Sequence, residues 1–380
     1  MLSKIIIKNF KCFKEETVFD FKKTNYKFLE KNVKGKLLKG LLFVGDNASG
    51  KTTAIEPIVL LLELLFKDKE VNLPIFHCLF SDERNTSLQY DFEIDGHEIQ
   101  YSFSFRQKKI LEEELILDNV QIIERIGDNA KLIMGNEKSI YAIDSSILFI
   151  KRLYFSTKFE GNETLKKWID FLKESVWINA YSRRIVTFNE ESLLYKDYFE
   201  KYGEEKINHF LRDNGFNYTI HYVNEIENNG VSFKNTGDGE KMVFFQREGI
   251  EIPIPLFLES TGNMTLINIL PSIIHSVEKG GLLIIDEFSS GFHNKLEELI
   301  IRYIMTYSNN TQVMLVSHST NLLSNSLLRP DQIYAVEMKG EKGSVLSRFS
   351  DEQPRVAQNL EKMYLSGIFG GIPEYEDKQE

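Results

Sequence analysis

The sequence predicts an α/β fold with a parallel sheet, and three observations support this. An apolar run, Leu41 to Val44, ends in a glycine-rich turn, and a long apolar helix is expected from Lys51 to Phe66. Two further apolar runs, Leu282 to Ile285 and Val313 to Val316, flank a segment with helical spacing from Asn294 to Ser308. Buried strands that alternate with helices are typical of βαβ units, and hence of a parallel sheet.

The segment from Ser87 to Asn119 has a different pattern, in which apolar and polar residues alternate. Asp95-Gly96 separates two such runs, as in a tight hairpin. We therefore expect an antiparallel sheet packed against the parallel core. The short run Lys4 to Ile7 is expected to form another buried strand.

The chain from about Glu163 to Gly215 is expected to be helical, with Trp168, Phe171, Leu172 and Val176 at helical spacing. A second helical segment is expected from Leu193 to Leu211. Neither repeats a heptad over several turns, so no long coiled coil is predicted.

Composition indicates a globular protein with a large core, since 42% of the 380 residues are hydrophobic. The longest apolar stretch, Ile58 to Phe66, is far shorter than the roughly 20 residues that cross a bilayer. No membrane partner and no secretory signal are expected, and the predicted location is cytoplasmic. The two cysteines, Cys12 and Cys78, lack metal-ligand spacing and are expected to be reduced thiols.

A protein whose whole surface binds nucleic acid would be basic throughout, and the formal net charge of -10 argues against this class of protein. Local basic patches remain, the richest between Lys31 and Lys39. Such a patch fits a solvated surface as well as a nucleic-acid contact.

The turn after Val44 matches the pattern G-x-x-x-x-G-K-[ST] and lies between an apolar strand and a helix. Glycines in such a loop let backbone N–H groups converge on phosphates, together with the positive end of the helix. Lys51 would add charge at the β- and γ-phosphates of ATP, and the Thr52 hydroxyl would ligate Mg²⁺. The predicted nucleotide-binding residues are Gly45, Asn47, Ala48, Ser49, Gly50, Lys51, Thr52 and Thr53.

Two carboxylates, Asp286 and Glu287, end the apolar run that begins at Leu282. In an open parallel sheet, ligands bind at the carboxyl ends of the strands. Asp286 is therefore expected to hold Mg²⁺ through water. Glu287 is expected to orient and polarise the attacking water, because phosphoryl transfer is catalysed mainly by positioning and electrostatics.

Two further motifs complete the predicted site. His318 follows the apolar run Val313 to Val316 and would face the γ-phosphate from the neighbouring strand. Ser260 and Gly262 lie where an apolar helix begins, and a helix N-terminus with a serine cap is an anion site. An ordinary helix cap is the alternative interpretation of Ser260.

In this order, the P-loop, the Ser-x-Gly at a helix start, LLIIDE and SHS resemble the ABC-class ATPases, which include chromosome-maintenance and break-repair enzymes. More narrowly, IIIKNFKCF, ESTGNMTL, DEFSSGFH, LLRPDQIYAVE and YLSGIFGGIP resemble the RloA/OLD-like, SMC-like ATPases of bacterial abortive-infection and phage-defence systems. The resemblance covers nearly the whole chain, with residues 160–250 as the exception. The motif at Ser260 departs from the transporter-type serine-glycine-glycine-glutamine, and no convincing Mg²⁺-sensing glutamine can be placed, since Gln89 is a poor candidate.

The resemblance implies an ABC-type ATPase head with an antiparallel β subdomain, a helical or mixed insertion, and a second parallel-sheet lobe carrying the signature and Walker B motifs. The expected division is 1–155 for the first lobe, 156–255 for the insertion and 256–380 for the second lobe. It also implies a homodimer, or a higher even oligomer, in which Ser260 and Gly262 of one chain close on the γ-phosphate held by Lys51 of the other. Gly291 to His293 would belong to the dimer contact.

Three functions are compatible with these features. The first is an ATP-driven sensor or switch that controls a partner effector, such as a nuclease or toxin, with DNA or a phage protein as the trigger. The second is a repair-like or SMC-like ATPase that clamps DNA directly. The third is a P-loop kinase acting on a small molecule, which would leave Ser260, Glu287 and His318 unexplained.

Overall fold

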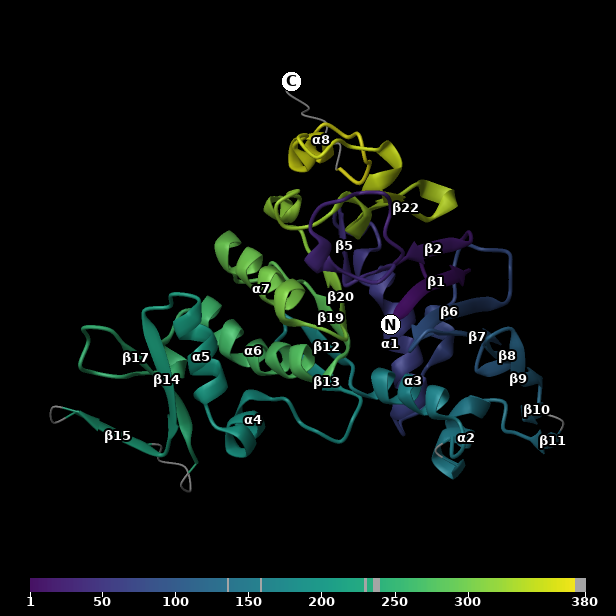
Figure 1. The fold of residues 1–380 in the computed structure, drawn as a ribbon, viewed down its shortest axis with the longest axis horizontal. Helices are drawn as coiled ribbons and strands as arrows, with labels where there is room; N and C mark the ends of the chain where they lie inside the picture. Colours follow the sequence, from purple (N-terminus) through teal and green to yellow (C-terminus); the bar gives the residue numbers. More distant parts are fainter. Residues whose placement is uncertain (135–136, 158, 229–230, 235–239, 373–380) are drawn as a thin grey trace.

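The computed structural model describes residues 1–134, 137–157, 159–228, 231–234 and 240–372 (Figure 1). Two large sheets organise these residues, and helices lie between the sheets and on the outer side of the second sheet. No helix in the described residues is both long enough and apolar enough to cross a membrane.

The first sheet has eight strands and is antiparallel throughout. Its strands in spatial order are β11 (Glu137–Ala142), β10 (Asn129–Met134), β9 (Val120–Ile126), β8 (Lys109–Leu117), β7 (His97–Arg106), β6 (Thr86–Ile94), β1 (Leu2–Lys8) and β2 (Thr17–Asp20). The hairpin expected at Asp95-Gly96 is the β6–β7 turn. The buried strand expected at Lys4 to Ile7 is β1, which pairs with β6 and β2.

The second sheet has seven strands and carries the predicted motifs. Its spatial order is β13 (Arg184–Thr187), β12 (Val176–Asn179), β19 (Gly281–Asp286), β20 (Thr311–Val316), β5 (Gly40–Gly45), β21 (Ile333–Met338) and β22 (Ser344–Arg348). The five central strands are parallel, and the two outer strands, β13 and β22, are antiparallel to their neighbours. The parallel sheet predicted from the sequence is thus confirmed.

The remaining elements connect or cover these sheets. The helices are α1 (Lys51–Phe66), α2 (Phe149–Thr157), α3 (Glu163–Lys173), α4 (Tyr195–Tyr202), α5 (Glu205–Asp213), α6 (Thr261–Lys279), α7 (Asn294–Tyr307) and α8 (Leu360–Leu365). The smaller strand sets are β3 (Val33–Lys34) with β4 (Leu37–Leu38), β15 (Glu225–Asn228) with β16 (Val231–Lys234), and β14 (Tyr218–Val223), β17 (Met242–Arg247) and β18 (Ile254–Pro255). Short 3-10 segments are η1 (Glu30–Asn32), η2 (Leu73–Phe76), η3 (Leu256–Leu258), η4 (Thr320–Leu322), η5 (Pro330–Gln332), η6 (Gly340–Lys342) and η7 (Phe349–Glu352).

Side-chain alternation along the parallel strands divides the interior into two cores. In β19, Leu282 and Ile284 pack into the core shared with the antiparallel sheet, α1 and α3. Leu283 and Ile285 point to the other face, where α6 and α7 cover them. Successive side chains of a strand point to opposite faces, so a strand buried on both faces is continuously apolar. The apolar runs in the sequence are therefore central strands.

The segment expected to be helical differs most from prediction. Helix α3 ends at Lys173, and Val176 begins β12, which pairs in parallel with β19. The expected second helix is divided into α4 and α5 around Gly203, whose φ of 70° lies in the left-handed region. The boundaries predicted at 155 and 255 stay predictions, but the chain between them supplies β12 and β13 to the central sheet.

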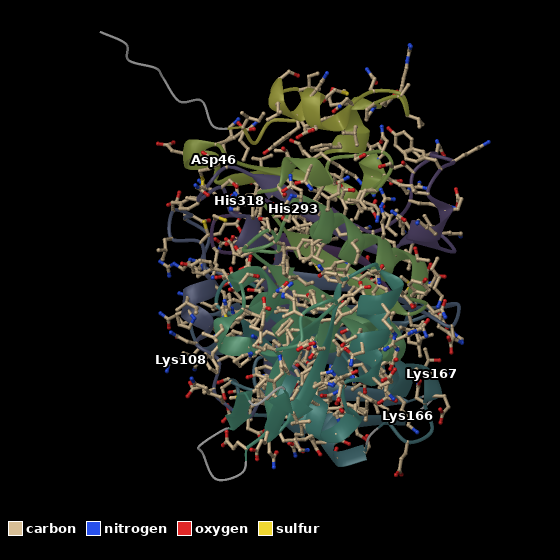
Figure 2. The ribbon with its side chains drawn as sticks, turned by 90° about the vertical axis from the view of Figure 1, so that its left-hand side faces the viewer. Asp46, Lys108, Lys166, Lys167, His293 and His318 are labelled. Carbon is tan, nitrogen blue, oxygen red and sulfur yellow. The ribbon has the colours of Figure 1, made fainter. Side chains whose placement is uncertain are left out.

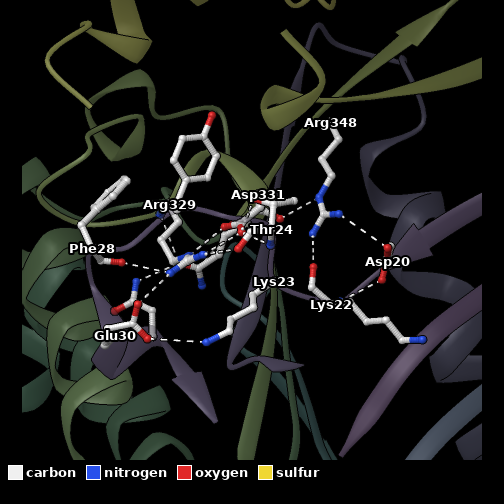
Figure 3. A network of polar contacts seen from close by, with 12 residues as sticks. Asp20, Lys22, Lys23, Thr24, Phe28, Glu30, Arg329, Asp331 and Arg348 are labelled. Carbon is white, nitrogen blue, oxygen red and sulfur yellow. Dashed lines mark hydrogen bonds and ion pairs between the residues drawn. The ribbon is translucent and has the colours of Figure 1, made fainter. Parts of the chain in front are cut away.

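A buried ion pair attaches the N-terminal segment to the start of β21 (Figure 3). The guanidinium of Arg329 is fully buried and donates two hydrogen bonds of 2.9 Å to the carboxylate of Asp331. Thr24 donates to Asp331 Oδ2 from its backbone N–H at 2.7 Å and from its hydroxyl at 2.8 Å. Arg329 also donates to the carbonyl of Phe28 at 3.0 Å. Both carboxylate oxygens of Asp331 therefore accept hydrogen bonds from other residues of the chain.

We predict that Asp331→Asn lowers the free energy of unfolding by about 3 kcal/mol, because it leaves a buried guanidinium without its counter-charge. Burial raises the pKa of Asp331, but Arg329 and Thr24 outweigh that effect and the pKa is lowered overall. A lowered pKa stabilises the fold above the ordinary value of about 3.9 and loses that contribution as pH falls further. The difference in the free energy of unfolding between wild type and Asp331→Asn, measured by urea unfolding, should therefore be smaller at pH 3 than at pH 7. Asp351→Asn, at an exposed position, is the control, and equal unfolding midpoints for wild type and Asp331→Asn would contradict the prediction.

Candidate active site

The phosphate-binding loop lies between β5 and α1, where its sequence context predicted it. Gly50 caps α1 with a φ of 105°, and a Cβ there would lie 2.6 Å from Cys12 Sγ. At Gly45 a Cβ would lie 2.3 Å from the carbonyl oxygen of Val336 in β21. Both positions therefore require glycine. The loop is held between β21 on one side and Cys12 on the other.

Lys51 lies at the start of α1 and is almost fully buried. Its Nζ donates to the carbonyl of Asp46 at 2.6 Å, so the side chain folds back over the loop. Burial lowers the pKa of Lys51, while the nearby carboxylates of Glu287, Asp46 and Asp286 oppose that effect. The Ser49 hydroxyl is also buried, and it has no hydrogen-bond partner among the described residues. The loop thus contains a mostly buried lysine and a buried hydroxyl without a hydrogen-bond partner among the described residues.

A hydrogen bond between Thr52 and Asp286 joins the P-loop to the carboxylate motif at the end of β19. The Thr52 hydroxyl donates to Asp286 Oδ1 at 3.1 Å, although the residues are 234 positions apart in the chain. Asp286 is buried, and burial raises its pKa, as does the charge of Glu287. Mg²⁺ in nucleotide sites prefers one or two protein oxygens completed by phosphate oxygens and water. A hydroxyl and a buried carboxylate side by side fit that requirement, although no group of three or more His, Cys, Asp or Glu residues in the described chain could hold a metal.

Glu287 and His318 lie next to this pair, at the ends of neighbouring strands. His318 Nε2 is 4.0 Å from Glu287 Oε2. Burial lowers the pKa of His318, and the charge of Lys51 lowers it further, so the imidazole is neutral at pH 7. Glu287 has a φ of 54°, in the left-handed region that is rare outside glycine. In Figure 2, His318 and Asp46 lie near each other in the upper part of the molecule.

Ser260 caps α6, and its Oγ accepts from the backbone N–H of Asn263 at 3.3 Å. Ser260 itself is exposed. In the part of the chain that the structure describes, no hydrogen bond or ion pair joins Ser260 or Gly262 to the P-loop. Gly262 instead packs against the loop after β19, since a Cβ there would lie 2.8 Å from the carbonyl oxygen of Gly291. His293, from the predicted dimer-contact loop, is exposed and caps α7.

Sequence reasoning missed Asn179, the last residue of β12. Its Nδ2 donates to Asp286 Oδ2 at 3.3 Å, so it contacts the carboxylate from the side opposite Thr52. Parallel pairing of β12 with β19 places the two residues directly across from each other. The short run VWIN ends in a polar residue like the other motif strands, and that similarity was the available clue.

Ser289 was also missed. Its hydroxyl accepts from the backbone N–H of His318 at 3.3 Å, which links the loop after β19 to the histidine. In the sequence, the double serine of DEFSSGFH stands out only as part of a family resemblance. Its role depends on which loop packs beside it, and the linear sequence does not show this.

Comparison with solved structures shows the same architecture. The SmcHead bound to the C-winged helix domain of ScpA is 13% identical, with a TM-score of 0.51 and coverage of 91% of this chain and 96% of that one. The Smc head domain with an extended coiled coil bound to the C-terminal domain of ScpA, from Pyrococcus furiosus, is 11% identical, with a TM-score of 0.53 and coverage of 93% and 97%. The SMC head domain from Thermotoga maritima is 16% identical, with a TM-score of 0.49 and coverage of 91% and 98%.

No curated protein matches the sequence. The family model described as "AAA domain, putative AbiEii toxin, Type IV TA system" matches residues 41–324, from β5 to the segment after η4. The match includes the P-loop, Asp286, Glu287 and His318. The fold is that of an ABC-type ATPase head. The chain belongs to this AAA-domain family.

Proposed function

We propose that this chain is an ATPase whose nucleotide lies between its own P-loop and the Ser260–Gly262 segment of a second copy. The observation that carries the proposal is the contact between Thr52 and Asp286, with Lys51, Glu287 and His318 around it. Phosphoryl transfer is catalysed mainly by positioning and by electrostatic stabilisation. This edge of the sheet supplies both.

Each residue has a separable role in this proposal. Lys51 and the backbone of the loop bind the phosphates of ATP. Thr52 and Asp286 would hold Mg²⁺, which neutralises phosphate charge when it is bound. Glu287 orients the attacking water. The neutral imidazole of His318 holds that water in place next to the γ-phosphate. The catalytic residues are therefore proposed to be Glu287 and His318.

The second copy is proposed because Ser260 is exposed at the start of a 19-residue helix, and no hydrogen bond or ion pair among the described residues joins it to the P-loop of its own chain. A long helix carries partial positive charge at its N-terminus, which favours a phosphate there. Two exposed apolar residues, Phe257 and Leu258, lie just before this cap and are separated from it by one residue, at 64% and 63% exposure. A surface of this kind is buried when another chain packs on it.

At the cellular level, we propose that ATP binding and hydrolysis make this protein a switch that controls a partner effector, a nuclease or toxin, in anti-phage defence. The family description, which names a toxin and a toxin–antitoxin system, supports a defence setting. DNA or a phage protein would be the trigger.

We predict that Glu287→Gln keeps ATP binding and slows hydrolysis by at least about a hundredfold, because the charge at the water is lost while the phosphate contacts remain. The ATP-bound dimer should then accumulate. Gel filtration of wild type and variant with ATP measures this. A variant no more associated than wild type would argue against a nucleotide shared between two chains.

We predict that Lys51→Ala abolishes ATP binding, whereas His318→Ala binds ATP with near wild-type affinity and loses turnover. Lys51 contacts the ground-state phosphates, while His318 acts on the water and the developing charge. Calorimetric titration with ATP, together with phosphate release, separates the two effects. If both variants bind equally poorly, His318 has a structural role and no catalytic one.

A mixture of Lys51→Ala and Ser260→Arg proteins tests the shared site. Each homodimer carries one lesion in both sites and should be inactive. A mixed dimer has one site with both lesions and one site with neither, so about a quarter of wild-type activity should return after random pairing. A mixture that stays inactive, although crosslinking shows exchange, would mean that Ser260 acts within its own chain or that the two sites are strictly coupled. A tandem fusion with both lesions in one half distinguishes these, because only coupling leaves it inactive.

A further inference from the structure

The last described part of the chain packs against two loops of the candidate active site. These residues, 360–371, comprise α8 and the turn that follows it, and we name them the C-terminal brace. We propose that the brace positions the P-loop through Tyr364 and the His318 loop through Glu361, so that these two residues are positioning residues for ATP hydrolysis. The inference rests on the proposed ATPase function.

The first contact reaches the P-loop. The hydroxyl of Tyr364 donates to the carbonyl of Gly371 at 2.9 Å, and both residues are buried. Gly371 lies directly against the first residue of the P-loop, since a Cβ on it would be 3.5 Å from the Cα of Gly45. The same Cβ would be 3.2 Å from the carbonyl oxygen of Val336. Gly45 also packs on that oxygen, so three backbone segments meet at one point.

The ring of Tyr364 has little freedom to move. Phe349 stacks on Phe369 with ring centroids 3.7 Å apart, and the ring of Tyr364 packs on Phe349 with centroids 5.9 Å apart. Burial raises the pKa of Tyr364 to about 12, and the charge of Asp46 in the P-loop adds to this effect. The phenol is thus a permanent donor at neutral pH. It supports the position of Gly371 against the loop.

The second contact reaches the loop that carries His318. Thr320, two residues after His318, donates its hydroxyl hydrogen to Glu361 Oε1 at 2.6 Å. Between them, the N–H of Ser319 donates to the Ser317 hydroxyl at 3.0 Å, which makes the segment a tight turn. A shift of α8 relative to this turn therefore changes the position of the imidazole. Glu361 and Tyr364 lie three residues apart in one short helix, which ties the two loops together.

The two contacts should affect different kinetic constants. The P-loop contacts the phosphates in both the ground state and the transition state, and uniform binding of this kind changes KM with little effect on kcat. His318 acts on the water and the developing charge, so its displacement changes kcat. A purely structural role for α8 would instead change both constants together with thermal stability.

For the first contact, Tyr364→Phe removes one hydrogen bond and keeps the ring. We expect KM for ATP and the ATP dissociation constant to rise about threefold to tenfold, the range for one net hydrogen bond, with kcat within about twofold of wild type. Steady-state phosphate release and calorimetric titration measure these values. Tyr307→Phe, at an exposed tyrosine at the end of α7, is the matched control.

For the second contact, Glu361→Ala should lower kcat about threefold to tenfold and leave ATP affinity unchanged. Glu361→Gln should restore kcat, because the amide oxygen can still accept from Thr320. Thr320→Val should match Glu361→Ala, and the double variant should be no worse than either single one, since both remove the same contact. Lys362→Ala, at the exposed neighbouring position of α8, is the control.

The proposed role of the brace is contradicted if Tyr364→Phe and Glu361→Ala leave KM and kcat at their wild-type values. It is also contradicted if both variants change KM and kcat together with a lower Tm. The proposed function survives either result if wild type hydrolyses ATP and Lys51→Ala does not. A wild-type protein that neither binds nor hydrolyses ATP overturns the proposed function and the brace with it.

Discussion

The candidate site depends on the parallel pairing of β5, β20 and β19. Parallel strands end at the same edge of a sheet, so the P-loop, Asp286 and the His318 turn are brought together although they are far apart in the sequence. The hydrogen bond from Thr52 to Asp286 is the direct result of that alignment. A shift of one residue in the register of β19 would turn Asp286 to the opposite face and remove the contact.

The two cores on either side of the sheet explain how this edge is kept rigid. One core packs the antiparallel sheet and α1 against the strands, and the other packs α6 and α7 against them. The edge of the sheet that carries the candidate site contains two ionisable side chains, Lys51 and Asp286, that are both mostly hidden from solvent. Burial lowers the pKa of Lys51 and raises that of Asp286. Nearby carboxylates oppose the effect at Lys51, and hydrogen bonds from Thr52 and Asn179 oppose it at Asp286. The pair is therefore suited to a ligand that brings its own phosphates and a cation.

The fold class could be predicted, and the motifs of the candidate site could be located, because both follow from local patterns. The P-loop has a fixed spacing, α1 is a long apolar segment almost free of turn residues, α7 has helical spacing, and buried parallel strands are continuously apolar. Strand β12 could not be predicted, because four residues of alternating burial do not reveal a partner that lies about a hundred residues later in the chain. Asn179 was missed with it. Likewise, the contacts of Thr320 with Glu361 and of Gly371 with Gly45 join segments whose proximity depends on the complete fold.

The position of β21 between β5 and β22 also bears on how the protein is made. A nascent chain that has reached residue 330 already contains the P-loop, Asp286 and His318, but it lacks the strand whose Val336 carbonyl packs on Gly45. It also lacks Gly371, which packs against Gly45 and the same Val336 carbonyl oxygen. Domains fold as the chain leaves the ribosome, from the N-terminus onward. The phosphate loop therefore gains its full support only after residues 333–371 have been synthesised, so a shorter nascent chain carries the motifs of the site without its finished geometry.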